Sequence, residues 1–261
     1  EENRKMTETT KVILEKYQVR KNKKQKRAFA SYVEQIASEE GYSYKSEKGL
    51  FGAENLIVGD PKRAKVVYTA HYDTCAHSLF PNFITPKNFS LYILFQLLIV
   101  VLALAVSFLI DLFLTLVLPL TPLAEEISLS LKSTLSQLGF IGFLLLLIFG
   151  PANKHTANDN TSGVTTVLDL MKELPQDQRS KVAFVLFDLE EAGILGSASF
   201  AAKHKQIKKN TLVINFDCVS DGETMMFGLK KNTLKHAELL GQAFVSNEDV
   251  TVDIGKIALY P

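Results

Sequence analysis

Four polar segments stand at the ends of apolar runs in this sequence, and their side chains are of types that bind metal ions. They are His71–Asp73, Asn158–Gly163, Asp188–Glu191 and Asp217. A single segment of this kind would mean little, because Asp and Asn are common in helix caps and turns. In a sheet of parallel strands, however, ligands gather beyond the carboxyl ends of the strands. One imidazole with several carboxylates at that edge suits zinc or a similar divalent ion.

Alternating strand and helix patterns surround these segments. We expect helices over 11–38, 162–173, 192–205 and 233–245, and strands over 55–58, 65–70, 181–187 and 211–216. The strand at 181–187 is a continuous apolar run, as expected for a strand that is buried on both faces. The alternation predicts an α/β fold with a mostly parallel sheet covered by helices on both faces.

A long apolar insertion separates His71 from Asp159. Residues 89–110 contain no charged side chain, and a second uncharged run covers 133–153. A bilayer core of about 30 Å needs roughly 20 apolar residues in a helix. We therefore predict a transmembrane helical hairpin over 80–152, inserted into a discontinuous domain made of 1–79 and 153–261. The alternative is a pair of core helices in a soluble protein.

The charges around the insertion indicate an orientation. Lys87 and Lys154 flank the side of the hairpin that holds both long polar segments, whereas its connecting loop carries Glu125, Glu126 and Lys132. Positive charge accumulates on the cytoplasmic side of membrane proteins. We expect an integral membrane protein that contacts the lipid bilayer and has its polar domain on the cytoplasmic face. The basic cluster at 20–27 agrees with this orientation, although a solvated helix face would explain it equally well.

The composition excludes several other classes of protein. Of the 261 residues, 29 are Lys or Arg and 28 are Asp or Glu, and this near balance argues against a nucleic-acid partner. A hydrophobic content of 47% argues against overall disorder. Cys75 and Cys218 are too few for a disulfide scaffold or a cysteine-rich zinc module.

Taken together, the polar segments resemble the motifs of the M28 zinc peptidases, the co-catalytic di-zinc aminopeptidase family. The matching motifs are His71-x-Asp73, Asp159-Asn160-x-Ser162-Gly163, Glu190-Glu191 and Asn215-Phe216-Asp217. The resemblance covers about residues 50–79 and 153–228. It implies a three-layer α/β/α fold of the phosphorylase/hydrolase-like type with two zinc ions at the strand ends. It also implies a zinc metallopeptidase of the aminopeptidase type with a peptide substrate.

The resemblance also implies a role for each residue of the site. His71 and Asp217 would bind one zinc ion, Asp159 would bridge both ions, and Glu191 would bind the second. Glu190 would be the general base, a task that needs a carboxylate free of metal. Asp73 would hydrogen-bond the far nitrogen of His71 and fix its tautomer. We expect His204 and His236, which have no place in the pattern, to face solvent.

Two departures from the family pattern leave alternatives open. The pattern has a second-zinc histidine beyond the last strand, and no histidine follows His236. Either the sequence stops before that residue or the second site is incomplete. The apolar insertion is the other departure. A catalytically silent relative that serves binding or assembly at the membrane is the alternative to an exopeptidase. Aminoacyl cyclisation fits less well.

Overall fold

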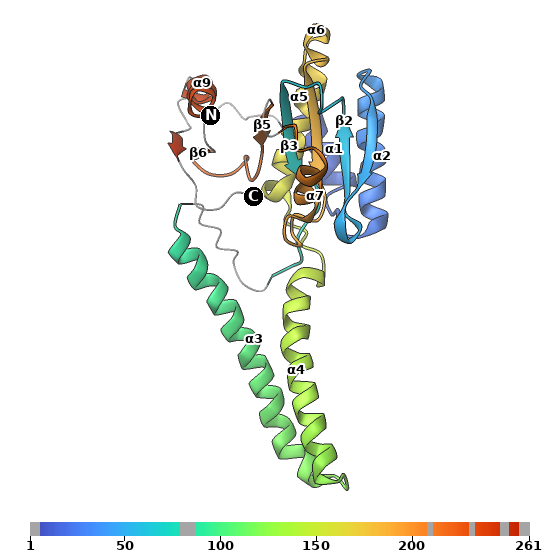
Figure 1. Cartoon of the computed structure of the whole chain (residues 1–261), viewed down its shortest axis with the longest axis vertical. Helices are drawn as coiled ribbons and strands as arrows, with labels where there is room; N and C mark the ends of the chain where they lie inside the picture. Colours follow the sequence, from blue (N-terminus) through green and yellow to red (C-terminus); the bar gives the residue numbers. More distant parts are fainter. Residues whose placement is uncertain (1–5, 79–86, 208–210, 230–232, 246–250, 256–261) are drawn as a thin grey trace.

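A five-stranded sheet forms the centre of the α/β part of the chain (Figure 1). The computed structural model describes residues 6–78, 87–207, 211–229, 233–245 and 251–255, and the fold is given for these. The strand order is β1-β2-β4-β3-β5. The strands are β1 (Tyr44–Lys48), β2 (Glu54–Val58), β3 (Val66–His71), β4 (Val182–Phe187) and β5 (Leu212–Asn215).

The sheet is mixed rather than mostly parallel, which corrects the prediction from the sequence. β3 is parallel to both β4 and β5, whereas β2 is antiparallel to both β1 and β4. The connection from β1 to β2 is short and contains η1 (Leu50–Gly52), and a connection of this length joins antiparallel strands. The α/β class is confirmed. Because β3, β4 and β5 are parallel, their carboxyl ends meet at one edge of the sheet.

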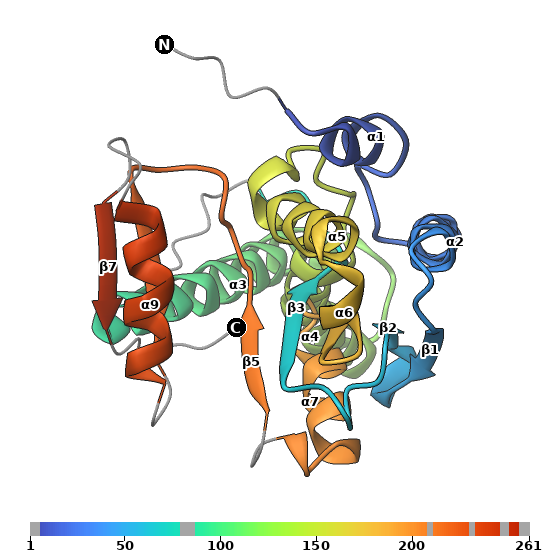
Figure 2. The ribbon, with the colours of Figure 1, turned by 90° about the horizontal axis from the view of Figure 1, so that it is seen from above.

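Helices lie on both faces of the sheet. Figure 2 shows α1, α2 and α5 on one side of the strands and α7 on the other. The bounds are α1 (Glu8–Lys16), α2 (Lys23–Glu39), α5 (Gly163–Glu173), α6 (Gln176–Arg179) and α7 (Leu195–Lys203). Within the described residues α7 is the main helix on the second face, so the three-layer arrangement stays a prediction.

Alternation along β4 divides the core into two clusters. Val182, Phe184 and Leu186 pack beneath α2 and α5, whereas Ala183 and Val185 face Phe200 of α7. Successive side chains of a strand point to opposite faces, so a run that is apolar throughout must be covered on both sides. The apolar run predicted as a strand at 181–187 is therefore explained by its central position.

The helix predicted over 11–38 is interrupted, and this part of the prediction is wrong. α1 ends at Lys16, and α2 begins only at Lys23 after a capping box, in which the side chains of Asn22 and Gln25 bond each other's backbone N–H groups. Such a box satisfies backbone donors that a helix start would otherwise leave unpaired. The segment between the two helices carries Arg20, which is fully buried. The basic cluster at 20–27 is thus not a uniformly solvated face.

A small unit that the sequence patterns did not predict as a whole lies beside β5. β6 (Thr224–Gly228) and β7 (Thr251–Gly255) pair in parallel, and α9 (Leu234–Val245) runs between them in the chain. α9 packs closely on β7, because a Cβ atom added at Gly241 would lie 3.1 Å from Val252 Cγ1. Only the helix of this unit was expected.

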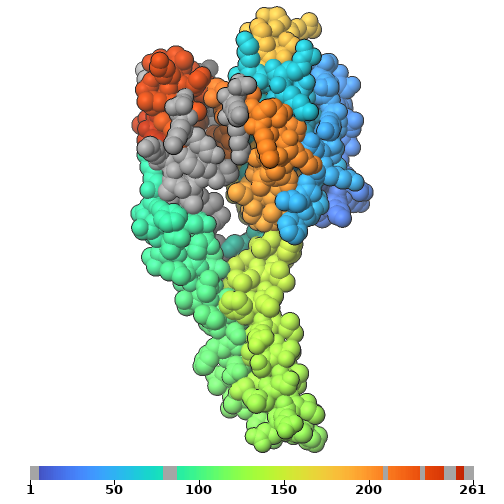
Figure 3. Space-filling view, viewed as in Figure 1, coloured from blue at the N-terminus to red at the C-terminus, as the bar shows by residue number. Residues whose placement is uncertain are grey.

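Two long helices project from the α/β part, as Figure 3 shows in outline. They are α3 (Phe89–Val117), which continues into η2 (Leu118–Leu120), and α4 (Glu125–Phe149). They touch where a Cβ atom at Gly139 would meet Ile110, and Ser107 Oγ donates to Ser136 O at 2.9 Å. Both are long and apolar enough to cross a membrane, and only 6% of the most apolar window of each is buried.

The base of this hairpin is fixed to the segment that follows β3. His77 N donates to Pro151 O at 2.6 Å, and Asn153 N donates to Cys75 O at 3.1 Å. Ala76 and Ala152 form an antiparallel bridge between the same segments. The segment just after α4 is therefore tied by backbone hydrogen bonds to the chain a few residues beyond His71.

Candidate metal centre

The carboxyl ends of the parallel strands bring the predicted site residues together. His71 is the last residue of β3, and its Nε2 lies 3.2 Å from Asp159 Oδ1 and 3.7 Å from Asp217 Oδ1. Glu190 Oε2 is 4.0 Å from the same nitrogen. Glu191 offers a ligand atom to the group that contains His71 and Asp159. The clustering expected from the sequence is thus present in the structure.

Asp73 links the histidine to the two glutamates. His71 Nδ1 faces Asp73, with the backbone oxygen at 3.2 Å and the carboxylate Oδ1 at 3.5 Å. The Asp73 carboxylate accepts hydrogen bonds from the backbone N–H groups of Glu190 at 3.1 Å and Glu191 at 3.2 Å. One buried carboxylate therefore orients the imidazole and the loop that carries both glutamates.

Asn160 holds the loop with Asp159 against the end of β5. Its Nδ2 donates to Phe216 O at 2.9 Å, and its Oδ1 accepts from Gly163 N at 3.0 Å and Cys218 N at 3.2 Å. Residue 163 must be glycine for this approach, because an added Cβ atom would lie 2.4 Å from Phe216 O. These contacts place Asp159, in η3 (Ala157–Ser162), opposite Asp217.

Arg20 joins two of the loops that carry site residues, and sequence reasoning missed it. Its Nε donates to Tyr72 O at 2.5 Å, and one terminal nitrogen donates to Thr161 Oγ1 at 3.1 Å. The other terminal nitrogen donates to Tyr17 O at 2.8 Å. The cation is completely buried, and burial lowers its pKa to about 10. No short-range pattern marks Arg20, because the groups it binds at Tyr72 and Thr161 are distant in sequence.

Burial and mutual repulsion perturb the acidic groups of the site. Burial raises the pKa of Glu190 to about 7, and burial together with Asp159 raises the pKa of Glu191 to about 8. Burial alone would lower the pKa of His71, but hydrogen bonds to Asp159, Asp217 and Asp73 hold it well above its ordinary value. The site thus concentrates carboxylates that a cation would stabilise.

The donor set fits a divalent metal ion. Ligand atoms of His71, Asp159 and Glu191 lie within 4.8 Å of one another, and so do those of Asp159, Asp217 and Cys218. Asp159 belongs to both groups, as expected of a bridging ligand. Glu191 Oε1 is buried and has no hydrogen-bond partner, a costly state that a metal ion would relieve. The Cys218 thiol was not expected in such a group.

His204 and Asp188 lie outside the site, and both make contacts with residues that are distant in sequence. His204 is buried beside Glu47, with Nε2 3.2 Å from Oε2, so its predicted solvent exposure is wrong. Its ring also stacks on Phe200, a contact that sequence spacing does not reveal. Asp188 pairs with Lys26 at 2.5 Å and accepts a hydrogen bond from Glu54 N, which gives it a structural role.

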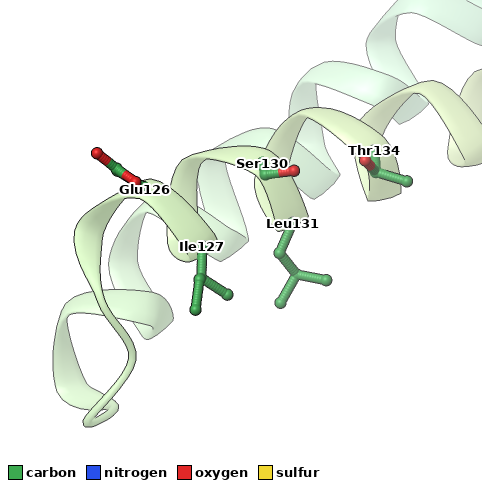
Figure 4. Close-up of a pocket in the computed structure, with 5 residues that line it drawn as sticks. All are labelled: Glu126, Ile127, Ser130, Leu131 and Thr134. Carbon is green, nitrogen blue, oxygen red and sulfur yellow. The ribbon is translucent and has the colours of Figure 1, made fainter.

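The surface has two hollows, and only the second contains residues of the site. A shallow one of about 370 Å³ lies on a single face of α4 near the hairpin tip, where Ile127 and Leu131 point to the same side (Figure 4). The other, of about 400 Å³, contains Asp73 and Glu191 and is bordered by Ile148 and Phe149 at the end of α4. The second hollow therefore joins the acidic site to the base of the hairpin.

Comparison with known proteins agrees with the resemblance seen in the motifs. Residues 144–252 match the family model of peptidase family M28, a region that includes Asp159, Glu190, Glu191 and Asp217. Aminopeptidase YwaD of Bacillus subtilis (strain 168) is 32% identical over 83 residues. That match covers 30% of this chain and 18% of the relative, so it spans a small part of that protein. The predicted resemblance to peptidase family M28 is confirmed.

Solved structures share the fold at low sequence identity. A glutaminyl cyclase of Porphyromonas gingivalis is similar with a TM-score of 0.52 and 13% identity, covering 97% of this chain and 75% of that one. A leucine aminopeptidase precursor of Bacteroides thetaiotaomicron has a TM-score of 0.51 and 14% identity, with coverage of 95% and 75%. At these identities the likeness concerns the fold alone.

Proposed function

We propose that this chain, with its M28 resemblance, is a membrane-anchored zinc-dependent exopeptidase, most simply an aminopeptidase. The convergence of His71, Asp159, Glu191 and Asp217 at one sheet edge carries the proposal. The matched family and the aminopeptidase relative support peptide-bond hydrolysis as the reaction class. We further propose that 1–79 and 153–261 form one discontinuous catalytic domain and that 80–152 forms its membrane insertion.

Four side chains are proposed as metal ligands. Asp159 would be the ligand shared by two zinc ions, because it belongs to both ligand groups. His71 and Asp217, whose Nε2 and Oδ1 atoms lie 3.7 Å apart, would hold one ion and Glu191 the other, although the two ligand groups place Glu191 with His71 and Asp217 with Cys218. The second site receives no histidine from the described residues. When bound, zinc ions supply a water of lowered pKa and polarise the peptide carbonyl.

Glu190 is proposed to move the proton. It lies within reach of the cluster but outside both ligand groups, and its side chain is about a quarter exposed. Before a metal ion binds, burial raises the pKa of Glu190 to about 7. A carboxylate outside the ligand set can both accept and release a proton. Asp73 keeps Glu190 in place through the Glu190 N–H group. The proton taken from water then passes to the leaving amine.

The hairpin is proposed to span the bilayer, with the catalytic domain on the cytoplasmic face. The low burial of α3 and α4 argues against the alternative of two core helices, since core helices are mostly buried. Large apolar side chains such as Leu94, Phe108 and Phe113 are more than half exposed along α3. A soluble protein rarely exposes so continuous an apolar surface.

The alternative is a catalytically silent domain that serves binding or assembly. Such a domain has no chemical need for a metal-ligand set together with a free glutamate of raised pKa beside it. The orphaned Glu191 oxygen likewise favours a site that binds a cation. Catalysis is therefore the preferred function, and the comparison of Glu190 and Glu191 variants distinguishes it from binding.

The test compares Glu190→Gln with Glu191→Gln in purified full-length chain, by peptidase assay and metal quantification. Glu190→Gln removes the base but keeps the shape, so kcat should fall by at least ~10²-fold while metal content stays near that of the parent chain. KM should change little, because Glu190 does not hold substrate. Glu191→Gln should instead lower the metal content.

Turnover by Glu190→Gln close to that of the parent chain would reject Glu190 as the base. If the parent chain itself binds zinc but cleaves no peptide from a panel covering all amino-terminal residues, the binding function takes its place.

A further inference from the structure

The edge of the sheet that carries the candidate metal centre is also the edge from which the hairpin extends. Lys21 Nζ, in the segment before α2, donates to Ile148 O in the last turn of α4 at 2.7 Å. Asp188, directly after β4, accepts from Lys26 Nζ at 2.5 Å and from Glu54 N at 3.0 Å. The start of α2, the start of β2 and the end of α4 therefore lie together at the carboxyl end of β4.

The turn between β1 and β2 exposes two large apolar side chains at this edge. Leu50 is 60% exposed and Phe51 is 84% exposed. Phe51 has a φ of 52°, in the left-handed region that bulky residues rarely enter outside turns. Figure 1 shows the connection into β2 at the lower end of the α/β part, beside the base of α4. The turn thus exposes an aromatic ring on the side of the molecule from which the hairpin extends.

Contacts with α7 hold the backbone of this turn. Leu50 N donates to Ser199 Oγ at 2.9 Å, and Lys203 Nζ donates to Lys48 O. The exposure of Phe51 is therefore a property of a turn that is packed on a helix.

The rest of the α/β part has few comparable side chains. Over 6–78 and 153–207, the exposed large hydrophobic residues are Met6, Leu50, Phe51 and Ile194. Ile194 N donates to Glu190 O at 2.8 Å in the loop after β4, so three of the four belong to the edge with the metal centre. The opposite edge, before β3, exposes cations instead, namely Lys62, Arg63 and Lys65. Single apolar residues are ordinary on a surface, whereas their concentration at one edge indicates an apolar contact there.

Three cations lie beside the turn. Lys23, Lys24 and Arg27 are exposed at the start of α2, and none of them forms an ion pair with an acidic side chain in the described part of the chain. We call these three residues the basic triplet. Figure 2 shows α2 next to β1, the strand that leads into the turn. Basic clusters next to a membrane span attract anionic lipid headgroups.

We propose that this edge of the α/β part docks on the bilayer surface, with the Leu50–Phe51 turn in the interfacial layer and the basic triplet against anionic headgroups. The inference rests on the proposed membrane hairpin and adds a second, separate contact with lipid. Aromatic side chains are favoured at the membrane–water interface, and apolar side chains that enter it leave water. The two contacts together fix the angle of the domain, so that the metal centre faces the membrane surface.

The first test measures lipid contact in the full chain reconstituted into phosphatidylcholine vesicles. The chain contains no Trp, so Phe51→Trp, Leu97→Trp and Gln178→Trp each introduce a single fluorophore. Leu97 is exposed on α3, and Gln178 belongs to α6 at the other end of the α/β part. Lipid brominated near the headgroup should quench the emission of Phe51→Trp and leave that of Gln178→Trp unchanged. Lipid brominated near the chain end should quench Leu97→Trp more than Phe51→Trp.

The second test compares headgroups in the Phe51→Trp chain. Brominated phosphatidylglycerol should quench its emission more than brominated phosphatidylcholine does, and replacing the whole basic triplet by Glu should remove this excess. The matched control replaces Lys62, Arg63 and Lys65 by Glu, which changes the same residue types and the same charge at the opposite edge. It should keep the excess. Equal quenching by the two lipids before any replacement, or the same loss in both sets, would overturn the headgroup contact.

The docking and the hairpin fail in different ways. Quenching of Leu97→Trp without quenching of Phe51→Trp would reject the docking and keep the hairpin. Quenching of Phe51→Trp alone would reject the span and keep the surface contact. Quenching of neither would reject both.

Discussion

Replacing Arg20 tests whether one buried cation holds the N-terminal segment to the loops of the metal centre. Arg20→Met keeps the aliphatic stem over Phe29 but removes the guanidinium, whose centre lies 5.3 Å from that ring. The change strands Tyr72 O, Tyr17 O and Thr161 Oγ1 without their donor.

The expected loss follows from these contacts. Each buried acceptor left unsatisfied costs about 1–3 kcal/mol, so the two buried ones, Tyr72 O and Thr161 Oγ1, set a range of about 2–6 kcal/mol, and the part-buried Tyr17 O adds less. Water entry and local relaxation reduce this, and we expect the free energy of unfolding to fall by about 3–5 kcal/mol. A domain with a total stability of about 5–15 kcal/mol would be visibly weakened.

Arg179→Met provides a matched control. Arg179 also donates several hydrogen bonds, to Leu174 O and to Glu40, and also lies over an aromatic ring, that of Tyr42 at 5.2 Å. Its side chain is 19% exposed, whereas Arg20 is fully buried. Because water can hydrogen-bond the groups that Arg179 leaves, the free energy of unfolding of Arg179→Met should fall by only about 1 kcal/mol.

The assay is urea unfolding of the full chain in detergent, followed by tyrosine fluorescence because the chain has 8 Tyr and no Trp. With slopes of about 1–3 kcal/mol per M, Arg20→Met should lower the midpoint by more than about 1 M. Arg20→Lys keeps the charge but can donate to fewer of the acceptors, so its urea midpoint should lie between those of the parent chain and Arg20→Met. Equal midpoints for Arg20→Met and Arg179→Met would refute the reasoning from burial.

Three further outcomes are expected. Asp159→Ala should lose more bound zinc than Glu191→Ala in metal analysis after dialysis, because Asp159 belongs to both ligand groups; the opposite order would reject it as the bridge. The chain should remain in the membrane fraction after alkaline extraction and require detergent for release, and recovery in the soluble fraction would reject the hairpin as a membrane span. Burial would raise the pKa of Glu47, but hydrogen bonds from His204 and Lys45 lower it. Glu47→Gln should therefore destabilise the chain at pH 7. The difference in stability between the variant and the parent chain should fade as the pH falls below the ordinary glutamate pKa of about 4.3. A difference that stays constant down to pH 3 in thermal unfolding would contradict that sign.

The sequence was sufficient for the parts of the fold that depend on local pattern. β4 appears as an uninterrupted apolar run because both of its faces are covered, and the polar residues at its end mark the site edge. The family match covers 144–252, the part of the chain that holds the motifs around Asp159 and Glu190. The long uncharged runs of α3 and α4 were predicted because composition alone defines them.

Features that depend on distant partners were missed. β1 is a polar strand with the sequence YKSEK, and its pairing with β2 determines its structure. Arg20 looked like part of a solvated basic run, although it is fully buried and donates hydrogen bonds to Tyr72 O and Thr161 Oγ1, which are both distant in sequence. His204 was expected in solvent because its neighbours are lysines, and its partner Glu47 lies 157 positions away. In each case a contact across the fold outweighs the local composition.

The position of the insertion between His71 and Asp159 has a consequence for biosynthesis. His71 leaves the ribosome before the hairpin and Asp159 after it, so the ligand set remains divided while the hairpin is being synthesised. At about 5–20 residues per second, the intervening 87 residues take roughly 4–17 s. In the proposed arrangement the first ligand waits at the membrane during this time, and the centre closes only after the chain has returned from the bilayer. In the proposed arrangement the metal centre is therefore complete only after the whole hairpin has been synthesised.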